Sequence, residues 1–438
     1  MRFLQFLSLL ATCALLPASA AQPPNVLLII SDDQAWGDYS FMGHEQIKTP
    51  HLDKLASESL TYTRGYVVAP LCRPSLAAIF SGKFVHQHGI TGNDPRVPAG
   101  KKRGGRSNPE LAAIYETLMT RIDDDPGIGH VLGKAGYLSL QTGKWWEGDP
   151  KVRGGFTHAM THGDPRRGGR HGDAGLKISR NGMKPIVDFI SEAKQKKKPF
   201  FIWHAPFLPH SPHNPPPRLF KKYSELIKSA HVARYWAMCE WFDETCGELL
   251  DHLDQEGLRE NTIVLYVCDN GWIQNSQSGR YAPRSKQSPN EGGIRTPIMI
   301  RWPGKISPKR DEKTLVSSID LAPTILKACG LDVPKSMPGI DLRDTEGLAK
   351  RGQVFGAAYD HDVFDVDKPN QSMKTRYIVR GDWKLLVPNT KVLPNAKVEL
   401  YNLKVDPREL ADLASKQPDK VKALHAKLDA WWPGPTAN

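Results

Sequence analysis

Three short apolar runs, separated by long stretches with helical spacing, constrain the fold more than any other feature of the sequence. The runs are Val26 to Ile30, Phe200 to Trp203 and Ile263 to Cys268. A strand that is apolar along its whole length is buried on both faces, as in parallel sheets covered by helices. We therefore expect an α/β fold with a large mixed, mostly parallel sheet sandwiched by helices.

The stretch before the third run has apolar residues at steps of three and four. They are Val232, Tyr235, Cys239, Phe242, Cys246, Leu249 and Leu253. This spacing predicts one long helix with a single buried face, and Gly257 is typical of a helix end.

The composition changes near residue 350. Tyr377 to Val379 and Trp383 to Val387 are predicted strands on either side of a turn, and the chain closes on an amphipathic helix. We expect a large domain over residues 22–348 and a smaller C-terminal α+β subdomain over residues 349–438. The Pro-, Gly- and Lys-rich segment from Pro95 to Arg106 is predicted to be an exposed loop.

The first 21 residues have the pattern of a secretory signal peptide. A basic start, an apolar run from Phe3 to Pro17 and the small residues Ala18-Ser19-Ala20 precede a predicted cleavage site. No later run approaches the ~20 apolar residues that a membrane-spanning helix needs. We expect an exported protein, periplasmic or extracellular, without a membrane span.

The net charge of +12 gathers in basic runs, which are Lys101 to Arg106, Arg166 to Arg170 and Lys194 to Lys198. No nucleic-acid recognition motif or aromatic interleaving accompanies them, so a nucleic-acid partner is not expected. An anionic substrate and simple solvated loops both remain open explanations.

Five of the six cysteines follow the predicted signal peptide, which is an odd number for a disulfide scaffold. Cys239 and Cys246 are separated by about 10.5 Å along a helix at ~1.5 Å per residue, too far for a disulfide. At least one cysteine therefore needs another explanation.

Two pairs of polar side chains follow apolar strands: Asp32-Asp33 and Asp269-Asn270. Ligands of open α/β sheets gather beyond the carboxyl ends of the strands. Four hard oxygen donors at that edge favour Ca²⁺ or Mg²⁺ over zinc. Each pair alone is equally compatible with a strand-end turn or a helix cap.

The run from Pro70 to Gly82 places Cys72 before a predicted helix. Backbone N–H groups and the helix dipole stabilise negative charge at such a position. Taken alone, Cys72 is also compatible with a buried structural cysteine.

This run resembles the signature of the formylglycine-dependent sulfatase family, in which Cys-x-Pro-Ser-Arg opens a helix that ends in Thr/Ser-Gly. The resemblance continues in order along most of the chain after the predicted signal peptide. Its further motifs are Asn25 to Gly37, Gly136-Tyr137 with Thr142 to Trp145, Pro209 to Pro212, Asn261 to Gly271, Lys286 with Glu291 to Pro297, Asp320 to Thr324, and Glu399 to Leu403 with Asp406-Pro407.

The resemblance implies a sulfuric ester hydrolase of the alkaline phosphatase superfamily. Cys72 is then converted to formylglycine by a modifying enzyme, and the hydrated aldehyde attacks sulfur. One Ca²⁺ per chain is held by the modified Cys72 and by four further residues, which are Asp32, Asp33, Asp269 and Asn270.

The resemblance also assigns the remaining catalytic residues. Lys144 and Lys286 contact sulfate oxygens, where positive charge stabilises the transition state. His210 protonates the leaving oxygen, a role that suits imidazole near neutral pH. Asp269 is also a candidate to assist deprotonation of the hydrated aldehyde.

The chain departs from the family pattern at two positions. Leu76 replaces the family Arg after Ser75, and Trp146 replaces the family His after Lys144-Trp145. These changes remove a charged donor and an imidazole from the site. The segment from His158 to His171 is rich in His and Arg, and is interpreted either as a source of substitutes or as a polar surface loop.

Three functional hypotheses remain open from the sequence. The first is hydrolysis of a sulfate ester on a sulfated small molecule or a sulfated glycan. The second keeps the fold and metal but changes the substrate to a phosphonate or phosphate ester. The third is a non-catalytic binder of sulfated glycan. Trp145, Trp146 and Trp203 are candidates for sugar stacking or for the core.

Overall fold

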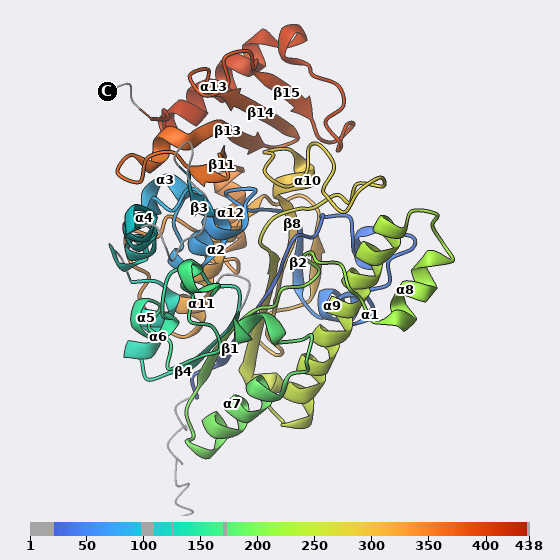
Figure 1. The fold of residues 1–438 in the computed structure, drawn as a ribbon, viewed down its shortest axis with the longest axis vertical. Coiled ribbons are helices and arrows are strands. Elements are labelled where there is room, and N and C mark those ends of the chain that lie inside the picture. The colour runs from blue at the N-terminus through green and yellow to red at the C-terminus, as the bar shows by residue number, and fades with distance from the viewer. Residues whose placement is uncertain (1–21, 98–108, 125, 170–172, 436–438) are drawn as a thin grey trace, which may run out of the picture.

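The computed structural model describes residues 22–97, 109–124, 126–169 and 173–435. The predicted signal peptide over residues 1–21 therefore lies outside the described residues. A large body is built around a central sheet, and the C-terminal part of the chain, drawn in orange and red, lies at one end of it (Figure 1).

The central sheet has nine strands and is mostly parallel. Only β8 runs antiparallel to its neighbours, and the other pairs in the sheet are parallel. In spatial order the strands are β10 (Val316–Ser317), β2 (Leu60–Tyr66), β8 (Arg295–Arg301), β7 (Thr262–Cys268), β1 (Asn25–Ser31), β6 (Phe200–Ala205), β4 (Leu138–Gly143) and β5 (His158–Ala159), with β9 (Lys309–Asp311) paired to β2. The predicted mixed, mostly parallel α/β sheet is confirmed, and β1, β6 and β7 contain the three apolar runs.

Helices cover both faces of this sheet, as fully apolar strands require. Along β1, Val26, Leu28 and Ile30 face one core, and Leu27 and Ile29 face the other. Helices α1 (Pro50–Ser57), α7 (Lys184–Gln195) and α9 (Ala230–Gln255) pack on one face, and helices α2 (Cys72–Ser81), α5 (Ile128–Lys134) and α11 (Leu321–Ala328) pack on the other.

Helix α9 is the long helix predicted from the three-and-four spacing. The predicted stripe is buried except for Val232, which lies in the first turn and is partly exposed. Glu256 caps the helix, and Gly257 follows it with a φ of +69°, a left-handed conformation that glycine adopts without strain.

The C-terminal subdomain is an antiparallel sheet with a helix on one face. Its strands are β11 (Gln353–Tyr359), β13 (Met373–Arg380), β14 (Trp383–Pro388) and β15 (Glu399–Asn402), and its helix is α13 (Pro418–Trp431). Leu424 and Leu428 of α13 pack on one face of the sheet, while Tyr377 and Tyr401 on the other face join the core of the large domain. The predicted α+β subdomain is confirmed. The predicted boundary between residues 348 and 349 falls inside helix α12 (Thr345–Arg351).

A two-stranded parallel pair, β3 (Asp94–Pro95) and β12 (Asp362–Val363), connects the two parts of the molecule. The prediction of an exposed loop starting at Pro95 is wrong at its first residue, because this pairing buries Pro95. Residues 98–108 of that loop lie outside the described residues. The remaining α-helices among the described residues are α3 (Val85–His88), α4 (Pro109–Thr120), α6 (Pro150–Arg153), α8 (Pro217–Ser224) and α10 (Glu291–Ile294).

The cysteines that follow the predicted signal peptide are free thiols, including Cys239 and Cys246 on α9. Within the four described ranges, no helix combines the length and the apolar character required to cross a bilayer.

Candidate functional site

The predicted site residues converge at the carboxyl ends of four neighbouring parallel strands, in the order β7, β1, β6 and β4. Asp32 follows β1, Asp269 follows β7, Lys144 follows β4, and His210 lies on the loop after β6. This is the edge at which ligands of α/β sheets bind. Four segments that are far apart in the sequence therefore meet because their strands are neighbours in the sheet.

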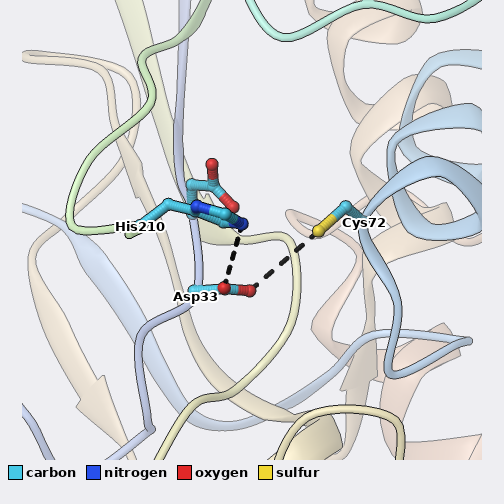
Figure 2. Close-up of side chains that lie close together, drawn as sticks. Asp33, Cys72 and His210 are labelled. Atoms are coloured by element: carbon cyan, nitrogen blue, oxygen red, sulfur yellow. Dashed lines mark hydrogen bonds and ion pairs between the residues drawn. The ribbon is translucent and has the colours of Figure 1, made fainter. Parts of the chain in front are cut away.

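The two acidic pairs are locked together by hydrogen bonds. The backbone N–H of Asp33 donates to Asp269 Oδ1 at 3.2 Å, and Asn270 Nδ2 donates to Asp33 Oδ1 at 2.7 Å. Asp33 has a φ of +63°, a left-handed conformation that Asp tolerates better than most residues. The turn after β1 thereby points the Asp33 carboxylate toward Cys72 and His210 (Figure 2).

Buried oxygen atoms without hydrogen-bond partners test whether these residues suit a metal ion. Oδ2 of Asp32, Oδ2 of Asp269 and Oδ1 of Asn270 are buried and accept no hydrogen bond. Burial raises the pKa of Asp32 and of Asp269, because a desolvated carboxylate is costly unless a cation lies next to it. A set of converging hard oxygen donors fits Ca²⁺.

The two predicted lysines lie against these carboxylates. Lys144 Nζ is 2.6 Å from Asp32 Oδ1 and 3.9 Å from Asp269 Oδ2, and Lys286 Nζ is 2.6 Å from Asp33 Oδ1. Burial alone would lower the pKa of both lysines, but the neighbouring carboxylates raise it by more. The net pKa of both lysines therefore lies above the usual value, and both ammonium groups stay charged. Two buried positive charges therefore border the site.

Cys72 is the first residue of α2 and is 1% exposed. Its Sγ lies 4.0 Å from Asp33 Oδ1 (Figure 2). The same sulfur lies 3.2 Å from Lys286 Nζ. Burial raises the pKa of Cys72 to about 12, although Lys144 and Lys286 oppose that shift. The unmodified side chain is therefore a thiol at neutral pH, and a thiol is a poor nucleophile.

His210 faces Asp33 from the opposite side to Cys72 (Figure 2). Its Nε2 is 3.3 Å from Asp33 Oδ2 and 3.5 Å from Lys286 Nζ, and its Nδ1 is 2.6 Å from the carbonyl oxygen of Ser211. Burial and the charges of the two lysines lower the pKa of His210 well below its usual value. The ring is therefore neutral before a substrate anion arrives.

The two departures from the family pattern lie in one buried region beside the site. Leu76 and Trp146 line the same small cavity, and both are buried. Lys144 Nζ lies 5.2 Å from the ring centroid of Trp146 and 5.1 Å from that of Phe207. Cation–π contacts of this kind attract the ammonium group in addition to its ion pair with Asp32.

Two residues that support the site, Arg73 and Arg180, are not predicted by the sequence. Arg73 is fully buried and donates two hydrogen bonds to Glu147, Nε to Oε1 at 2.8 Å and Nη2 to Oε2 at 2.7 Å. This pair joins the residue after Cys72 to a residue three positions after Lys144. The sequence does place Arg73 next to Cys72 and Glu147 near Lys144. That the two charges pair with each other depends on the tertiary fold.

Arg180 was missed as well. It donates to the backbone oxygens of Phe207 at 2.8 Å and His210 at 3.3 Å, which fixes the loop that carries His210. No motif marks Arg180 in the sequence, because it contacts backbone atoms of a distant segment.

The candidate substitutes in the His- and Arg-rich segment from His158 to His171 are His162, Arg166, Arg167, Arg170 and His171, and His162 Nε2 lies 4.0 Å from Asp173 Oδ2. Arg166 forms ion pairs with Asp164 and Glu116, and Arg167 is exposed. Arg170 and His171 lie outside the described residues. The interpretation as a polar surface loop fits Arg166 and Arg167. Trp145, Trp146 and Trp203 belong to the core and are not free to stack on sugars.

Comparisons with known proteins agree with this geometry. Residues 24–331 match the family model described as Sulfatase, and residues 284–431 match the one described as N-sulphoglucosamine sulphohydrolase, C-terminal. The chain is similar to N-acetylgalactosamine-6-sulfatase of Canis lupus familiaris, with 28% identity over 378 residues that cover 77% of this chain and 69% of that protein.

Arylsulfatase A of Homo sapiens is 29% identical over 474 residues, covering 94% of this chain and 89% of that protein. The crystal structure of a sulfatase from Pseudoalteromonas sp. has the same fold, with a TM-score of 0.67, 22% identity, and coverage of 95% of this chain and 92% of that one. Since the Sulfatase family model matches well over half of the chain, the chain belongs to the sulfatase family and is a sulfuric ester hydrolase.

Proposed function

We propose that this sulfatase acts through formylglycine formed from Cys72, with one Ca²⁺ held by the acidic pairs. The observation that carries the proposal is the placement of Cys72. Its Sγ lies at the N-terminus of α2, within 4.0 Å of Asp33 Oδ1 and 3.2 Å of Lys286 Nζ, in a buried site bordered by two lysines.

The chemistry of the unmodified side chain supports a modification. Because burial keeps Cys72 protonated, the thiol itself has little nucleophilic character. Once a modifying enzyme has oxidised it, the hydrated aldehyde supplies a hydroxyl group for attack on sulfur. Leu76 lies where the family has an Arg that takes part in recognition by the modifying enzyme. Conversion of Cys72 is therefore the step that needs direct measurement.

The proposed calcium ligands are Asp32, Asp33, Asp269, Asn270 and the modified Cys72. The buried oxygens without hydrogen-bond partners on Asp32, Asp269 and Asn270 support this assignment. When bound, Ca²⁺ supplies positive charge that stabilises the nucleophile and the sulfate oxygens.

Lys144 and Lys286 are proposed to bind the sulfate oxygens of the substrate. Both are buried, charged and fixed in position, so little reorganisation is needed when negative charge develops. Trp146 and Phe207 make cation–π contacts with Lys144, which supports the view that Trp146 helps to position Lys144 in place of the family His.

His210 is proposed to protonate the leaving oxygen. The Ser211 carbonyl accepts a hydrogen bond from Nδ1–H of His210. This contact directs Nε2 toward the reacting groups. A bound sulfate monoester brings negative charge that offsets the two lysines, so the histidine gains proton affinity when substrate is present. The acid then transfers its proton to the ester oxygen as the S–O bond breaks.

The substrate is proposed to be a sulfated small molecule or a sulfated glycan. The similar proteins include one named for a sulfated amino sugar and one named as an arylsulfatase. The net charge of +12 favours an anionic substrate. A phosphonate or phosphate monoester is a tetrahedral anion of similar size and is the alternative substrate to be tested alongside.

Mass spectrometry of the Cys72 peptide from protein made in its native host tests the proposal. The expected result is a peptide with the aldehyde mass, together with loss of turnover in Cys72→Ala. Hydrolysis of 4-nitrophenyl sulfate is compared with that of the matching phosphonate ester. Full activity of Cys72→Ala would refute a nucleophile at this position, and faster phosphonate cleavage would change the substrate class.

We also propose that the chain is exported after removal of residues 1–21, on the strength of the basic, apolar and small-residue pattern there. N-terminal sequencing of protein recovered from outside the cytoplasm is expected to begin near Ala21 or Gln22. A protein that retains Met1 and stays in the cytoplasm would contradict it.

A further inference from the structure

One residue of the C-terminal subdomain, Glu409, forms hydrogen bonds to the loop that carries Lys286, both before and after Lys286. The backbone oxygen of Glu409 accepts a hydrogen bond from Arg284 Nη1, two residues before Lys286. The Glu409 carboxylate accepts from the backbone N–H of Glu291, five residues after Lys286, at 2.6 Å. Both ends of the Lys286 loop are therefore attached to the same distant residue.

A buried lysine pairs with both carboxylates at this contact, and Arg295 Nη1 lies 3.6 Å from the second oxygen of Glu291. Lys384 of β14 is 0% exposed, and its Nζ lies 3.1 Å from Glu291 Oε1 and 2.9 Å from Glu409 Oε1. Tyr66 donates to the second oxygen of Glu291 at 3.2 Å. Because unpaired buried charges are costly, Glu291, Lys384 and Glu409 hold one another in place. The loop cannot move without separating these charges.

The loop itself has a backbone that needs such support. Arg284 and Gln287, on either side of Lys286, have φ values of +58° and +64°, which are unfavourable for residues other than glycine. The backbone N–H of Gln287 donates to Pro70 O at 2.8 Å, two residues before Cys72. The position of this loop therefore determines where the Lys286 ammonium lies relative to Cys72.

We propose that Glu409, supported by Lys384, is a positioning residue for Lys286, so that the C-terminal subdomain completes the active site of the large domain. The proposal rests on the sulfate-binding role proposed above for Lys286. The side chain and backbone of Glu409 contact Arg284, Glu291 and Lys384, which are not proposed ligands of the sulfate or the metal. It acts through the loop, by fixing the ammonium group where the sulfate oxygens must bind.

A double-mutant cycle between Glu409 and Lys286 tests the proposal. Glu409→Ala is made in the wild-type chain and in Lys286→Met, and kcat/KM for 4-nitrophenyl sulfate is measured for all four proteins. A supporting residue of this kind contributes about tenfold or more, so a loss of about tenfold is expected in the wild-type chain. On the Lys286→Met background the loss is expected to be no more than about twofold, because the group being positioned is absent.

Two further variants separate positioning from general stability. Glu409→Gln keeps an oxygen that accepts the Glu291 N–H, and is expected to retain most of the activity. Glu346→Ala is the matched control, since Glu346 on α12 is 79% exposed, and it is expected to change nothing. If Glu409→Ala does not fold, the Lys384→Met/Glu409→Leu variant, which removes one charge of each sign and the oxygen that accepts the Glu291 N–H, replaces it in the cycle.

Equal losses on both backgrounds, or no loss in the wild-type chain, would overturn the positioning role. If Lys286→Met has no measurable turnover, the same cycle is run on binding of 4-nitrophenyl sulfate to the Cys72→Ala protein by calorimetry, with the same criterion. The proposed function fails by a different result, in which Lys286→Met itself binds and turns over substrate at the wild-type level. The two failures are therefore distinguishable.

Discussion

The two ring nitrogens of His210 lie in different surroundings, and this difference has a measurable consequence. Nδ1 is bonded to the Ser211 carbonyl, and Nε2 faces the groups around Cys72. An acid at Nε2 matters most when the leaving oxygen is a poor leaving group, since 4-nitrophenolate departs without help. The role of His210 is therefore best seen by varying the leaving group.

We expect His210→Ala to lower kcat by about 10²–10⁴-fold on an alkyl or sugar sulfate, the range of general acid catalysis, and by much less on 4-nitrophenyl sulfate. Steady-state kinetics on both substrates provide the measurement. His158→Gln on β5 is the control, and is expected to leave both rates unchanged. Equal losses on the two substrates would argue for a purely structural histidine.

His204 on β6 is a buried histidine whose titration affects stability and not chemistry. Its ring is 0% exposed between the hydroxyl groups of Thr142 and Ser179, and burial lowers its pKa to about 3. The folded state therefore keeps it neutral, while the unfolded chain takes up a proton below about pH 6.5. Stability is present in full above that pH and is lost as the pH falls toward 3.

We expect this one group to contribute a slope of about 1.4 kcal/mol per pH unit to the acid limb of the free energy of unfolding. His204→Gln removes the titration, so its acid limb should be flatter by that amount in urea unfolding measured from pH 7 to pH 4. His425→Gln on α13, whose side chain is 39% exposed, is the control and should preserve the wild-type slope.

At the scale of elements, the Arg73–Glu147 pair joins the start of α2 to the segment after β4. These two segments carry Cys72 and Lys144, and both charged side chains are almost fully buried. A buried charge that loses its partner is strongly destabilising. The pair therefore fixes the spacing of the segments that carry Cys72 and Lys144 and not only the local fold.

We expect Glu147→Ala to lower the free energy of unfolding by about 3–5 kcal/mol, because it leaves the Arg73 guanidinium buried without its partner. Chemical unfolding monitored by tryptophan fluorescence gives the value. The double variant Arg73→Met/Glu147→Leu, which removes both charges, should recover most of the loss. A double variant as unstable as the single one would show that shape and not charge dominates there.

Whether a strand can be predicted from the sequence depends on how apolar its residues are along its length. β1, β6 and β7 are apolar throughout, so their sequences alone predict a covered parallel sheet. β2, with the sequence LTYTRGY, and β8, with RTPIMIR, contain Arg, Gly or Pro and do not read as central strands. Their place is set by pairing with each other across the sheet, which local patterns do not encode.

The site shows the same division between local and long-range information. Asp32, Asp33, Asp269 and Asn270 were predictable, because strand ends and motifs mark them. The contacts that hold the site, such as Arg73 with Glu147 and Lys384 with Glu291, join segments 74 and 93 residues apart. Which charges pair over such distances is decided by the tertiary fold.

At the scale of the whole molecule, the proposed calcium site joins β1 to β7 at the centre of the large sheet. Without an ion, several carboxylates lie close together and are balanced by two lysines. A ligand that binds only the folded state stabilises it, by about 2.7 kcal/mol at a concentration 100 times its dissociation constant. Metal binding should therefore raise the stability of the entire large domain.

We expect chelation by EGTA to abolish hydrolysis and lower the melting temperature together, and Ca²⁺ in excess to restore both. Differential scanning fluorimetry and 4-nitrophenyl sulfate turnover on the same samples provide the comparison. Asn270→Ala should raise the Ca²⁺ concentration needed to restore the activity and the melting temperature. Asn389→Ala in the C-terminal subdomain should not change that concentration. Activity that survives exhaustive chelation would contradict a catalytic metal.

The burial of Cys72 has a consequence for the order of events during synthesis. Lys286, which helps to enclose it, follows it by 214 residues. At about 5–20 residues per second, the ribosome therefore takes roughly 10–40 s to supply the segment that closes over the thiol. The proposed modifying enzyme would have access to Cys72 only during that interval, so the fraction of active molecules is expected to depend on the relative rates of oxidation and folding.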